Sequence, residues 1–287
     1  MTQVAANVRV PRRRFALGAA WRQPLAIAGL LIAAVWIVIA IFAPLIAPHD
    51  PLAQTFTAAK GPSWSHPFGT DSLGRDVLSR TIWGARISLT IGLVSVGLAM
   101  VGGVPLGALA AWTGGWTDRL LMRAVDVLVS FPTLLLAIVV ITIFGPGLGH
   151  AMLAIGVAQV PLYARLTRAA VLRVRVQNFV EAARASGAGE WRIVRRHVLP
   201  NCLPPLLVQS TLLFATAILS AAYLGFLGLG AQPPTPEWGT MLAKARDFLR
   251  TAPHVSIFPG LTILMTVLGL NLLGDGLRDV LDPQTAG

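Results

Sequence analysis

The sequence contains few charged residues for its length. Asp, Glu, Lys and Arg make up only 12% of its 287 residues, whereas soluble globular proteins carry about 25%. Hydrophobic residues make up 55%, and the mean hydropathy is +0.69. This composition excludes an ordinary soluble domain and indicates an integral membrane protein.

Cysteine, metal-ligand spacings and nucleotide-binding motifs are also scarce or absent. A single cysteine, Cys202, excludes an intramolecular disulfide. Five scattered histidines lack the spacing of metal ligands, so we expect no metal site; they are His49, His66, His150, His197 and His254. No G-x-x-x-x-G-K-[ST] phosphate loop and no convergent catalytic group is apparent, so we expect no catalytic residues. If ATP drives this protein, another chain hydrolyses it.

The apolar residues cluster in six segments that we predict to cross the membrane as helices. They are residues about 25–47, 88–111, 124–144, 149–163, 203–229 and 257–273. The prediction is an all-α integral membrane protein, with a tail (1–24) followed by one transmembrane domain (25–287). The first segment is too long for the apolar core of a signal peptide, so we expect it to be retained.

Proline and glycine predict two features within these spans. Phe131-Pro132 predicts a kink or a break in the third span, because proline cannot donate a helical hydrogen bond. Gly103 and Gly107 have the small-x-x-x-small spacing that lets a second helix approach closely. We therefore expect the second span to pack tightly against a neighbour.

The basic residues predict that both termini are cytoplasmic. With six spans and the N-terminus inside, 16 of the 23 lysines and arginines fall in cytoplasmic segments and seven in outer segments. Cytoplasmic loops are enriched in basic residues. The same orientation places residues about 164–202 in the cytoplasm and residues 48–87 on the extracytoplasmic side. We therefore interpret the net charge of +11 as a topology signal and a contact with membrane lipids, not as a nucleic-acid-binding surface.

The longest polar stretch of the second half of the chain lies in that cytoplasmic segment. It begins at Glu181-Ala182-Ala183, passes Gly187 and ends at Leu199-Pro200. Small residues permit close approach, glycine permits a positive φ between two short helices, and proline disfavours a helical residue before it. We expect a helix–turn–helix on the membrane surface, ending at Leu199-Pro200, with its exposed side offered to a soluble partner.

The second half of this stretch predicts an amphipathic helix. Trp191, Val194 and Val198 fall at i, i+3 and i+7 on one face. Three arginines take the opposite face, where they can contact lipid phosphates; they are Arg192, Arg195 and Arg196.

The whole stretch resembles the EAA loop of permease subunits of bacterial ABC importers. The family form is Glu-Ala-Ala, three residues, Gly, nine residues, Ile, one residue, Leu-Pro. The matching residues are Glu181, Ala182, Ala183, Gly187, Leu199 and Pro200. His197 stands where many members have isoleucine, which leaves the spacing intact.

A second polar stretch lies between the first two spans. Thr70 or Asp71 is expected to cap a helix that follows. The i,i+4 pairs Asp71–Arg75 and Asp76–Arg80 are expected to meet on that helix. We favour a structural role for the stretch; passing substrate or fixing a partner subunit is the alternative.

This second stretch resembles the Gly-Thr-Asp-x-x-Gly-Arg-Asp signature of the dipeptide, oligopeptide and nickel branch of these permeases. The matching residues are Gly69, Thr70, Asp71, Gly74, Arg75 and Asp76. Residues 233–242 and 271–279 also resemble the branch, with His254 where a tryptophan is common. The resemblance covers nearly everything from Leu25 to Pro283.

The resemblance implies the type I ABC importer permease fold in a bacterial inner membrane. In that family the EAA loop, here about residues 164–202, docks in a cleft of an ATPase subunit. It implies Glu181 as a polar anchor, Ala182 and Ala183 as close-contact positions, and Gly187 as the break. The implied partners are two ATPase subunits, which hold ATP and Mg, a second homologous permease and an extracytoplasmic solute-binding protein. Peptides, nickel chelates and other small solutes remain open as substrates.

A secondary transporter driven by an ion gradient is the alternative reading. It predicts ionisable residues inside spans and inverted repeats. Asp126, near the start of the third span, is the acid that such a reading would use. We favour a structural role for Asp126 at the membrane interface over a proton relay.

Overall fold

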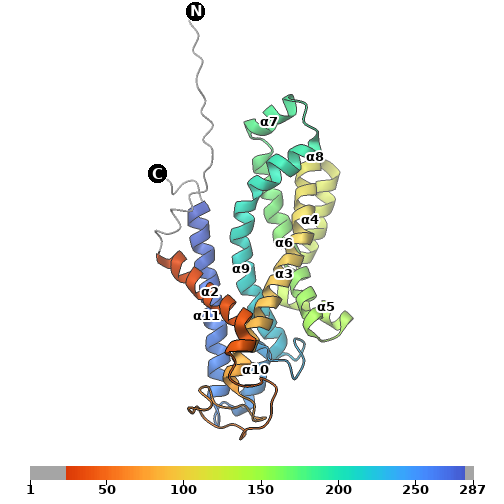
Figure 1. The fold of residues 1–287 in the computed structure, drawn as a ribbon. Helices are drawn as coiled ribbons and strands as arrows, with labels where there is room; N and C mark the ends of the chain where they lie inside the picture. The colour runs from red at the N-terminus through yellow and green to blue at the C-terminus, as the bar shows by residue number, and fades with distance from the viewer. Residues whose placement is uncertain (1–23, 282–287) are drawn as a thin grey trace, which may run out of the picture.

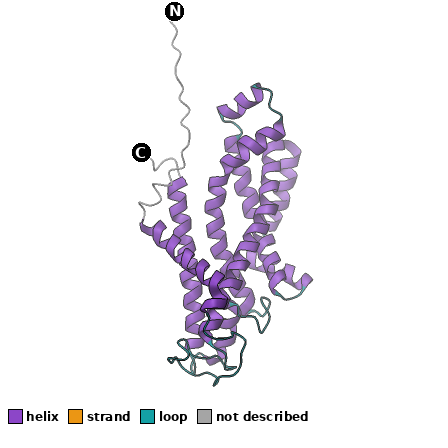
Figure 2. Cartoon of the chain, viewed as in Figure 1, coloured by secondary structure: helices purple, strands orange, loops and turns teal. Residues whose placement is uncertain are grey.

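The structure, a computed structural model, describes residues 24–281, and every regular element in that range is a helix (Figure 1, Figure 2). The α-helices are α2 (Pro24–Ile46), α3 (Val77–Thr113), α4 (Gly115–Val129), α5 (Thr133–Phe144), α6 (Leu148–Val174), α7 (Asn178–Ala185), α8 (Glu190–Ile193), α9 (Leu199–Phe226), α10 (Trp238–Ala245) and α11 (His254–Leu281). A π-helical turn (Val194–Val198) joins α8 to α9, and a 3-10 turn (Arg246–Phe248) follows α10. The predicted tail, residues 1–24, lies outside the described residues except for Pro24.

Four helical runs are long and apolar enough to cross a membrane. They are α2, α3, the continuous run Glu190–Phe226 and the run His254–Val280 in α11. The bent pair α4 and α5 is a fifth candidate if it counts as one span. The described residues therefore hold four or five candidate spans where the sequence predicts six. The other predicted span, 149–163, lies in α6, where His150, Gln159 and Arg165 interrupt the apolar residues.

Two helices extend beyond the predicted spans. The helix expected after the second polar stretch and the predicted span 88–111 form one continuous helix, α3, which begins at Val77, where Asp76 caps its first turn. Between the second and third predicted spans only Gly114 lies outside a helix, so Asp118, Arg119 and Arg123 lie within α4. Polar residues at the ends of these two helices therefore continue the helix beyond its apolar part.

The predicted break at Phe131-Pro132 is confirmed. Helices α4 and α5 meet there at an angle of 91°. Pro132 has an extended backbone, with φ −54° and ψ 132°, and stands immediately before α5. Because proline has no N–H to donate, the helical ladder of α4 stops and a new helix starts in another direction.

Helices α3 and α6 pack closely along the glycines that the sequence indicates. A Cβ at Gly103 would lie 2.6 Å from the carbonyl oxygen of Val160. A Cβ at Gly107 would collide with the backbone of Ala164 and lie 2.9 Å from the Arg168 nitrogen. The absence of side chains at both positions lets the two backbones approach, as predicted.

The EAA stretch (181–200) and the signature stretch (69–76) lie at opposite ends of the helix bundle (Figure 1). Helices α7 and α8 form one end, and the long connection between α2 and α3 forms the other together with α10. Trp238, fully buried at the start of α10, donates a 2.9 Å hydrogen bond to the carbonyl of Thr81 in α3. This contact fixes the end that holds α10 to α3.

Candidate functional site

Helix α7 is held on the end of the bundle by one apolar residue. Val180 is completely buried and belongs to a cluster with Ile193 of α8 and Val198 of the π turn. Burying a valine side chain stabilises by roughly 1.5–3 kcal/mol. This contact orients α7 so that its other face is left exposed.

The EAA residues lie on and beside that exposed face. Glu181 and Ala182 are exposed, whereas Ala183 is partly buried against the Val180 cluster. The Glu181 side chain makes no hydrogen bond with a described residue, and its carboxylate acts on the nearby Arg184 guanidinium only through its charge. An exposed carboxylate with no hydrogen bond, next to a methyl side chain, is an arrangement suited to docking against another protein.

Gly187 ends α7 with a positive φ of +80°. The Gly187 N–H bonds the carbonyl of Arg184 at 3.0 Å, and the Ala188 N–H bonds that of Ala183 at 3.1 Å. This pair of bonds is the Schellman motif, which glycine favours because it carries no Cβ. The predicted break between two short helices is confirmed in its geometry.

An ion pair closes the turn between α7 and α8. Arg184 donates two hydrogen bonds to the Glu190 carboxylate, at 2.8 and 3.2 Å. The Arg184 guanidinium also lies 5.9 Å from the centre of the Trp112 ring, at the end of α3. The sequence analysis missed this pair, although the six-residue separation across a glycine turn is compatible with it.

A polar hollow of about 290 Å³ opens beside this ion pair. Its lining comes from the ends of α3, α6, α7 and α8, namely Trp112, Arg175, Val176, Glu181, Arg184 and Glu190. Two carboxylates and two guanidiniums therefore face one recess. Such a surface can bind a partner's charged side chains in a fixed register.

Leu199-Pro200 does not end a helix, contrary to the prediction. Leu199 donates to the carbonyl of Val194, five residues back, so the chain passes through a π turn directly into α9. Pro200 then occupies the first turn of α9. The π turn shifts the hydrogen-bonding register just before a residue that has no N–H, so the helix continues.

The amphipathic pattern of the second half is confirmed in part. Val194 and Val198 are buried, and Arg192, Arg195 and Arg196 are exposed, as the pattern predicts. Trp191 was predicted to share a face with Val194 and Val198, but it is 73% exposed, and Ile193 is buried beside the two valines instead.

At the opposite end, the signature residues form a buried polar network. Asp71 is 6% exposed and bonds the Arg75 guanidinium at 2.6 Å, with Arg80 at 3.7 Å. The second oxygen of Asp71 accepts backbone N–H bonds from Leu73 and Arg75. The pair Asp71–Arg75 forms as predicted, but in the loop that precedes α3 rather than on a helix.

Asp76, not Thr70 or Asp71, caps the helix that follows. Its carboxylate accepts from the Ser79 N–H at 2.8 Å and from the Ser79 hydroxyl at 2.7 Å. The predicted pair of Asp76 with Arg80 does not form. Arg80 instead donates to the carbonyl of Pro51 at 2.9 Å, because capping already engages the carboxylate.

The remaining signature residues shape the loop. Gly69 and Gly74 have φ values of +73° and +70°, and a Cβ at Gly74 would collide with the carbonyl of Phe56. Thr70 is fully buried and bonds the backbone of Lys60. His254, the position that departs from the branch, donates from Nε2 to the Thr70 carbonyl at 3.1 Å. The six signature residues therefore lie inside the loop and support its fold.

Two further observations concern residues named in the sequence analysis. Asp126 is exposed on α4 and pairs with Arg165 of α6 at 2.6 Å. His49 and His66, which the sequence leaves far apart, lie on either side of Asp76. No local sequence pattern predicts that these two histidines meet, because only the folding of the connection between α2 and α3 brings them together.

Comparison with known proteins identifies the relatives of this chain. Residues 103–287 match the model of the binding-protein-dependent transport system inner membrane component, and residues 19–63 match the N-terminal transmembrane domain of oligopeptide transport permease C. The chain is 46% identical to the dipeptide transport system permease protein DppC of Alkalihalophilus pseudofirmus, over 97% of this chain and 94% of the relative. It is 48% identical to the glutathione transport system permease protein GsiD of Escherichia coli O157:H7, over 98% and 93%.

A solved structure shares the fold. The inward-facing MetNI methionine ABC transporter contains a chain that superimposes with a TM-score of 0.58 and 25% identity. The match covers 71% of this chain and 97% of that one. The sequence match and the structural match agree on the same class of membrane subunit.

Proposed function

Since the chain belongs to the family of binding-protein-dependent transport system inner membrane components, we propose that it forms half of the translocation pathway of its importer and couples that pathway to ATP hydrolysis through α7 and α8. It is an inner-membrane subunit of a bacterial ABC importer, and the ATPase is a separate chain. Family membership implies an ATPase, a solute-binding protein and a second permease as partners. We propose two ATPase subunits and one second, homologous permease per assembly.

The exposed face of α7 supports the docking role. It presents the Glu181 carboxylate and the small side chain of Ala182 at one end of the bundle, with the polar hollow beside them. The buried Val180 and the Arg184–Glu190 pair hold that face in one orientation. A rigid, charged and exposed element at the end of long helices can transmit movement of a partner to the membrane. This is the observation that carries the proposal.

We propose that α7 and α8 face the cytoplasm and that the connection between α2 and α3 faces outward. The distribution of basic residues supports this orientation. This orientation places both termini in the cytoplasm and requires six membrane crossings, one of which is made by α6. Helix α6 packs along α3 through the glycine contacts, so it lies within the bundle whether or not its own composition is strongly apolar.

We propose the mechanism that family membership implies. Two ATPase subunits close on ATP and Mg, which they bind themselves, and draw the α7 helices of the two permeases together. The membrane helices then rock between inward-open and outward-open states. Glu181 fixes the register of docking, Ala182 and Ala183 allow close contact, and Gly187 lets α7 and α8 take different directions. Leu199 and Pro200 carry the motion into α9.

We propose a peptide-like solute as the substrate. The relatives named for dipeptide and glutathione transport support this class. Selection within the class is assigned to the solute-binding protein, which meets the outward end of the bundle.

The test is reconstitution in liposomes of the transporter, which consists of this permease, the second permease, the ATPase and the solute-binding protein. With the binding protein and a dipeptide outside, ATP inside should drive uptake, and the permease pair alone should hydrolyse no ATP. Uptake that continues without ATP but collapses when an ion gradient is dissipated would instead establish a secondary transporter. In that case Asp126 would be the first residue to substitute.

A further inference from the structure

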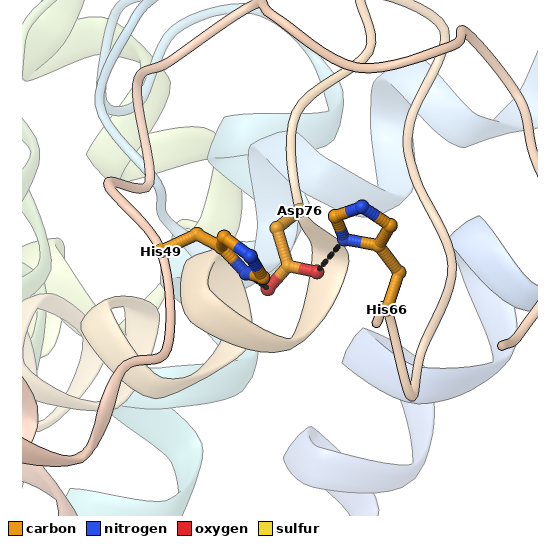
Figure 3. A group of neighbouring side chains, drawn as sticks. All are labelled: His49, His66 and Asp76. Carbon is orange, nitrogen blue, oxygen red and sulfur yellow. Dashed lines mark hydrogen bonds and ion pairs between the residues drawn. The ribbon is translucent and has the colours of Figure 1, made fainter. Parts of the chain in front are cut away.

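Three ligand-bearing side chains meet where the chain enters α3. His49 follows the end of α2, His66 comes from the loop, and Asp76 caps α3 (Figure 3). The His66 Nδ1 lies 2.9 Å from one carboxylate oxygen of Asp76, and the His49 Nδ1 lies 3.7 Å from the other. The three ligand atoms all lie within 4.8 Å of one another. Both imidazole rings point at the same carboxylate from opposite sides.

The charge of Asp76 is not balanced by an arginine or lysine among the described residues. Asp76 is completely buried, yet Arg75 and Arg80 are both directed to Asp71 instead. Its nearest basic groups are the two imidazoles. A buried carboxylate is costly unless it is paired or coordinates a metal ion.

One ring nitrogen in the group has no hydrogen-bond partner. The His49 Nδ1 is inaccessible to solvent and makes no hydrogen bond in the described structure. Its distance of 3.7 Å from the Asp76 carboxylate is too long for a hydrogen bond. Buried polar atoms of this kind are rare and call for an explanation such as an absent ion.

The surroundings restrict both rings. Phe56 packs against His66 and His49, with ring centres 4.4 and 5.0 Å apart, and the two imidazole centres are 4.9 Å apart. This aromatic packing keeps the ring nitrogens directed at Asp76. The His49 side chain is 28% exposed, so it has room on one side to shift by the small amount that coordination needs.

We propose that His49, His66 and Asp76 form a binding site for a divalent transition metal, with Zn²⁺ as the ion that fits it. Two imidazole nitrogens and one carboxylate oxygen are the ligand types of zinc sites, and a fourth position remains for water. Nitrogen ligands disfavour Ca²⁺ and Mg²⁺, which prefer oxygen. Ligand atoms about 2.0–2.2 Å from a tetrahedral ion lie roughly 3.3 Å apart, whereas the three ligand atoms here lie within 4.8 Å of one another, so the His49 ring moves toward the other two ligands on binding. The bound ion ties the end of α2 and the loop to the start of α3.

The test measures zinc directly and does not depend on transport. The assembled transporter is purified with an affinity tag that contains no histidine, stripped with a chelator and titrated with Zn²⁺. The wild type should bind one more Zn²⁺ ion per permease than His49→Ala, whose affinity at this site should fall at least about 100-fold. Co²⁺ in place of Zn²⁺ should give visible absorption bands of a tetrahedral site in the wild type only.

His150→Ala is the matched control, because His150 is an exposed histidine on α6 that bonds the carbonyl of Gly145 and does not belong to this group. A second measurement is the melting temperature, which bound Zn²⁺ should raise. His150→Ala should bind as many Zn²⁺ ions per permease as the wild type and should show the same rise in melting temperature. His49→Ala should bind one ion fewer and should not show the rise. His66→Ala, provided that it melts cooperatively, should behave like His49→Ala. Equal Zn²⁺ binding and equal Co²⁺ spectra for the wild type and His49→Ala would overturn the proposal, as would a wild type that binds no Zn²⁺ at all.

Discussion

At Gly187 the backbone takes a φ of +80°, and a single missing side chain decides how two helices meet. The sequence predicted this position because glycine permits a positive φ between two short helices. It also predicted the Asp71–Arg75 pair from spacing alone. It could not assign Asp76 as the helix cap, because Thr70, Asp71 and Asp76 are all suitable caps and only the folded loop decides among them.

The backbone strain at Gly187 gives a prediction with an internal control. Gly187→Val should reduce transport per ATP hydrolysed, because a Cβ at positive φ costs about 1–2 kcal/mol and reorients α8. Gly189→Val should have a much smaller effect, since Gly189 has a φ of −63°. A Cβ at either position would contact no heavy atom within 4 Å, so only the backbone conformation differs. The measurement is the ratio of uptake to hydrolysis in proteoliposomes. Equal ratios for the two variants would remove Gly187 from the coupling mechanism.

Glu237 gives a prediction about pH. Its side chain is buried, and it caps α10 through 2.8 Å bonds from the N–H groups of Gly239 and Thr240. Burial raises the pKa of Glu237, although the two backbone hydrogen bonds oppose the shift. Because the folded state holds the proton more tightly than the unfolded chain, its contribution to stability is complete below the unfolded pKa of 4.5 and is lost as the pH rises through the folded value.

Substituting this carboxyl should remove the pH dependence that it causes. The melting temperature of the wild type minus that of Glu237→Gln should decrease from pH 4.5 upward and level off once the pH exceeds the pKa of Glu237 in the folded state, with both proteins in the same detergent. Parallel melting curves across this range would show that Glu237 does not titrate differently in the folded and unfolded states.

At the scale of the helices, apolar segments and prolines predicted most elements but not their ends. The break at Pro132 follows from proline chemistry. The continuation through Pro200 does not, because a π turn is not encoded in any local pattern. Helix α3 begins well before its apolar part, since the Asp76 cap and buried polar residues such as Arg80 support its first turns.

The contact between α3 and α6 gives a prediction at this scale. Gly107→Ala should lower the stability of the protein by about 1–3 kcal/mol, because the added methyl meets the backbone of α6 and forces the helices apart. Gly97→Ala, on the same helix, has no heavy atom within 4 Å of the added Cβ. It should be neutral or slightly stabilising, because alanine favours a helix over glycine by roughly 0.5–1 kcal/mol. Thermal unfolding of the purified variants measures both effects, and equal melting temperatures would contradict the tight α3–α6 packing.

At the scale of the whole molecule, the sequence indicated a helical membrane protein of the correct family. The structure places the EAA residues and the signature residues at opposite ends of one bundle, as the distribution of lysines and arginines along the chain predicts. The sequence could not give the 91° turn between α4 and α5, which changes the direction of the chain within one predicted span.

Orientation across the membrane can be tested with cysteine labelling. Cys202 is replaced first, and single cysteines are then placed at Ser63, Thr235 or Ser186. A membrane-impermeant thiol reagent added outside intact cells should label positions 63 and 235, which belong to the outward end, and should label position 186 only after the membrane is opened. Labelling of position 186 from outside would reverse the orientation and remove the docking role of α7.

The most direct test of whether α7 docks on the ATPase subunit is a contact measurement at this helix. A photo-crosslinking amino acid is placed at Ala182 in the assembled transporter, with a second variant carrying it at Ser63 at the other end of the bundle. We expect a crosslinked adduct between position 182 and the ATPase subunit, and no adduct between position 63 and the ATPase subunit. An assembled, active transporter in which position 182 never crosslinks to the ATPase, or in which position 63 does, would contradict the account.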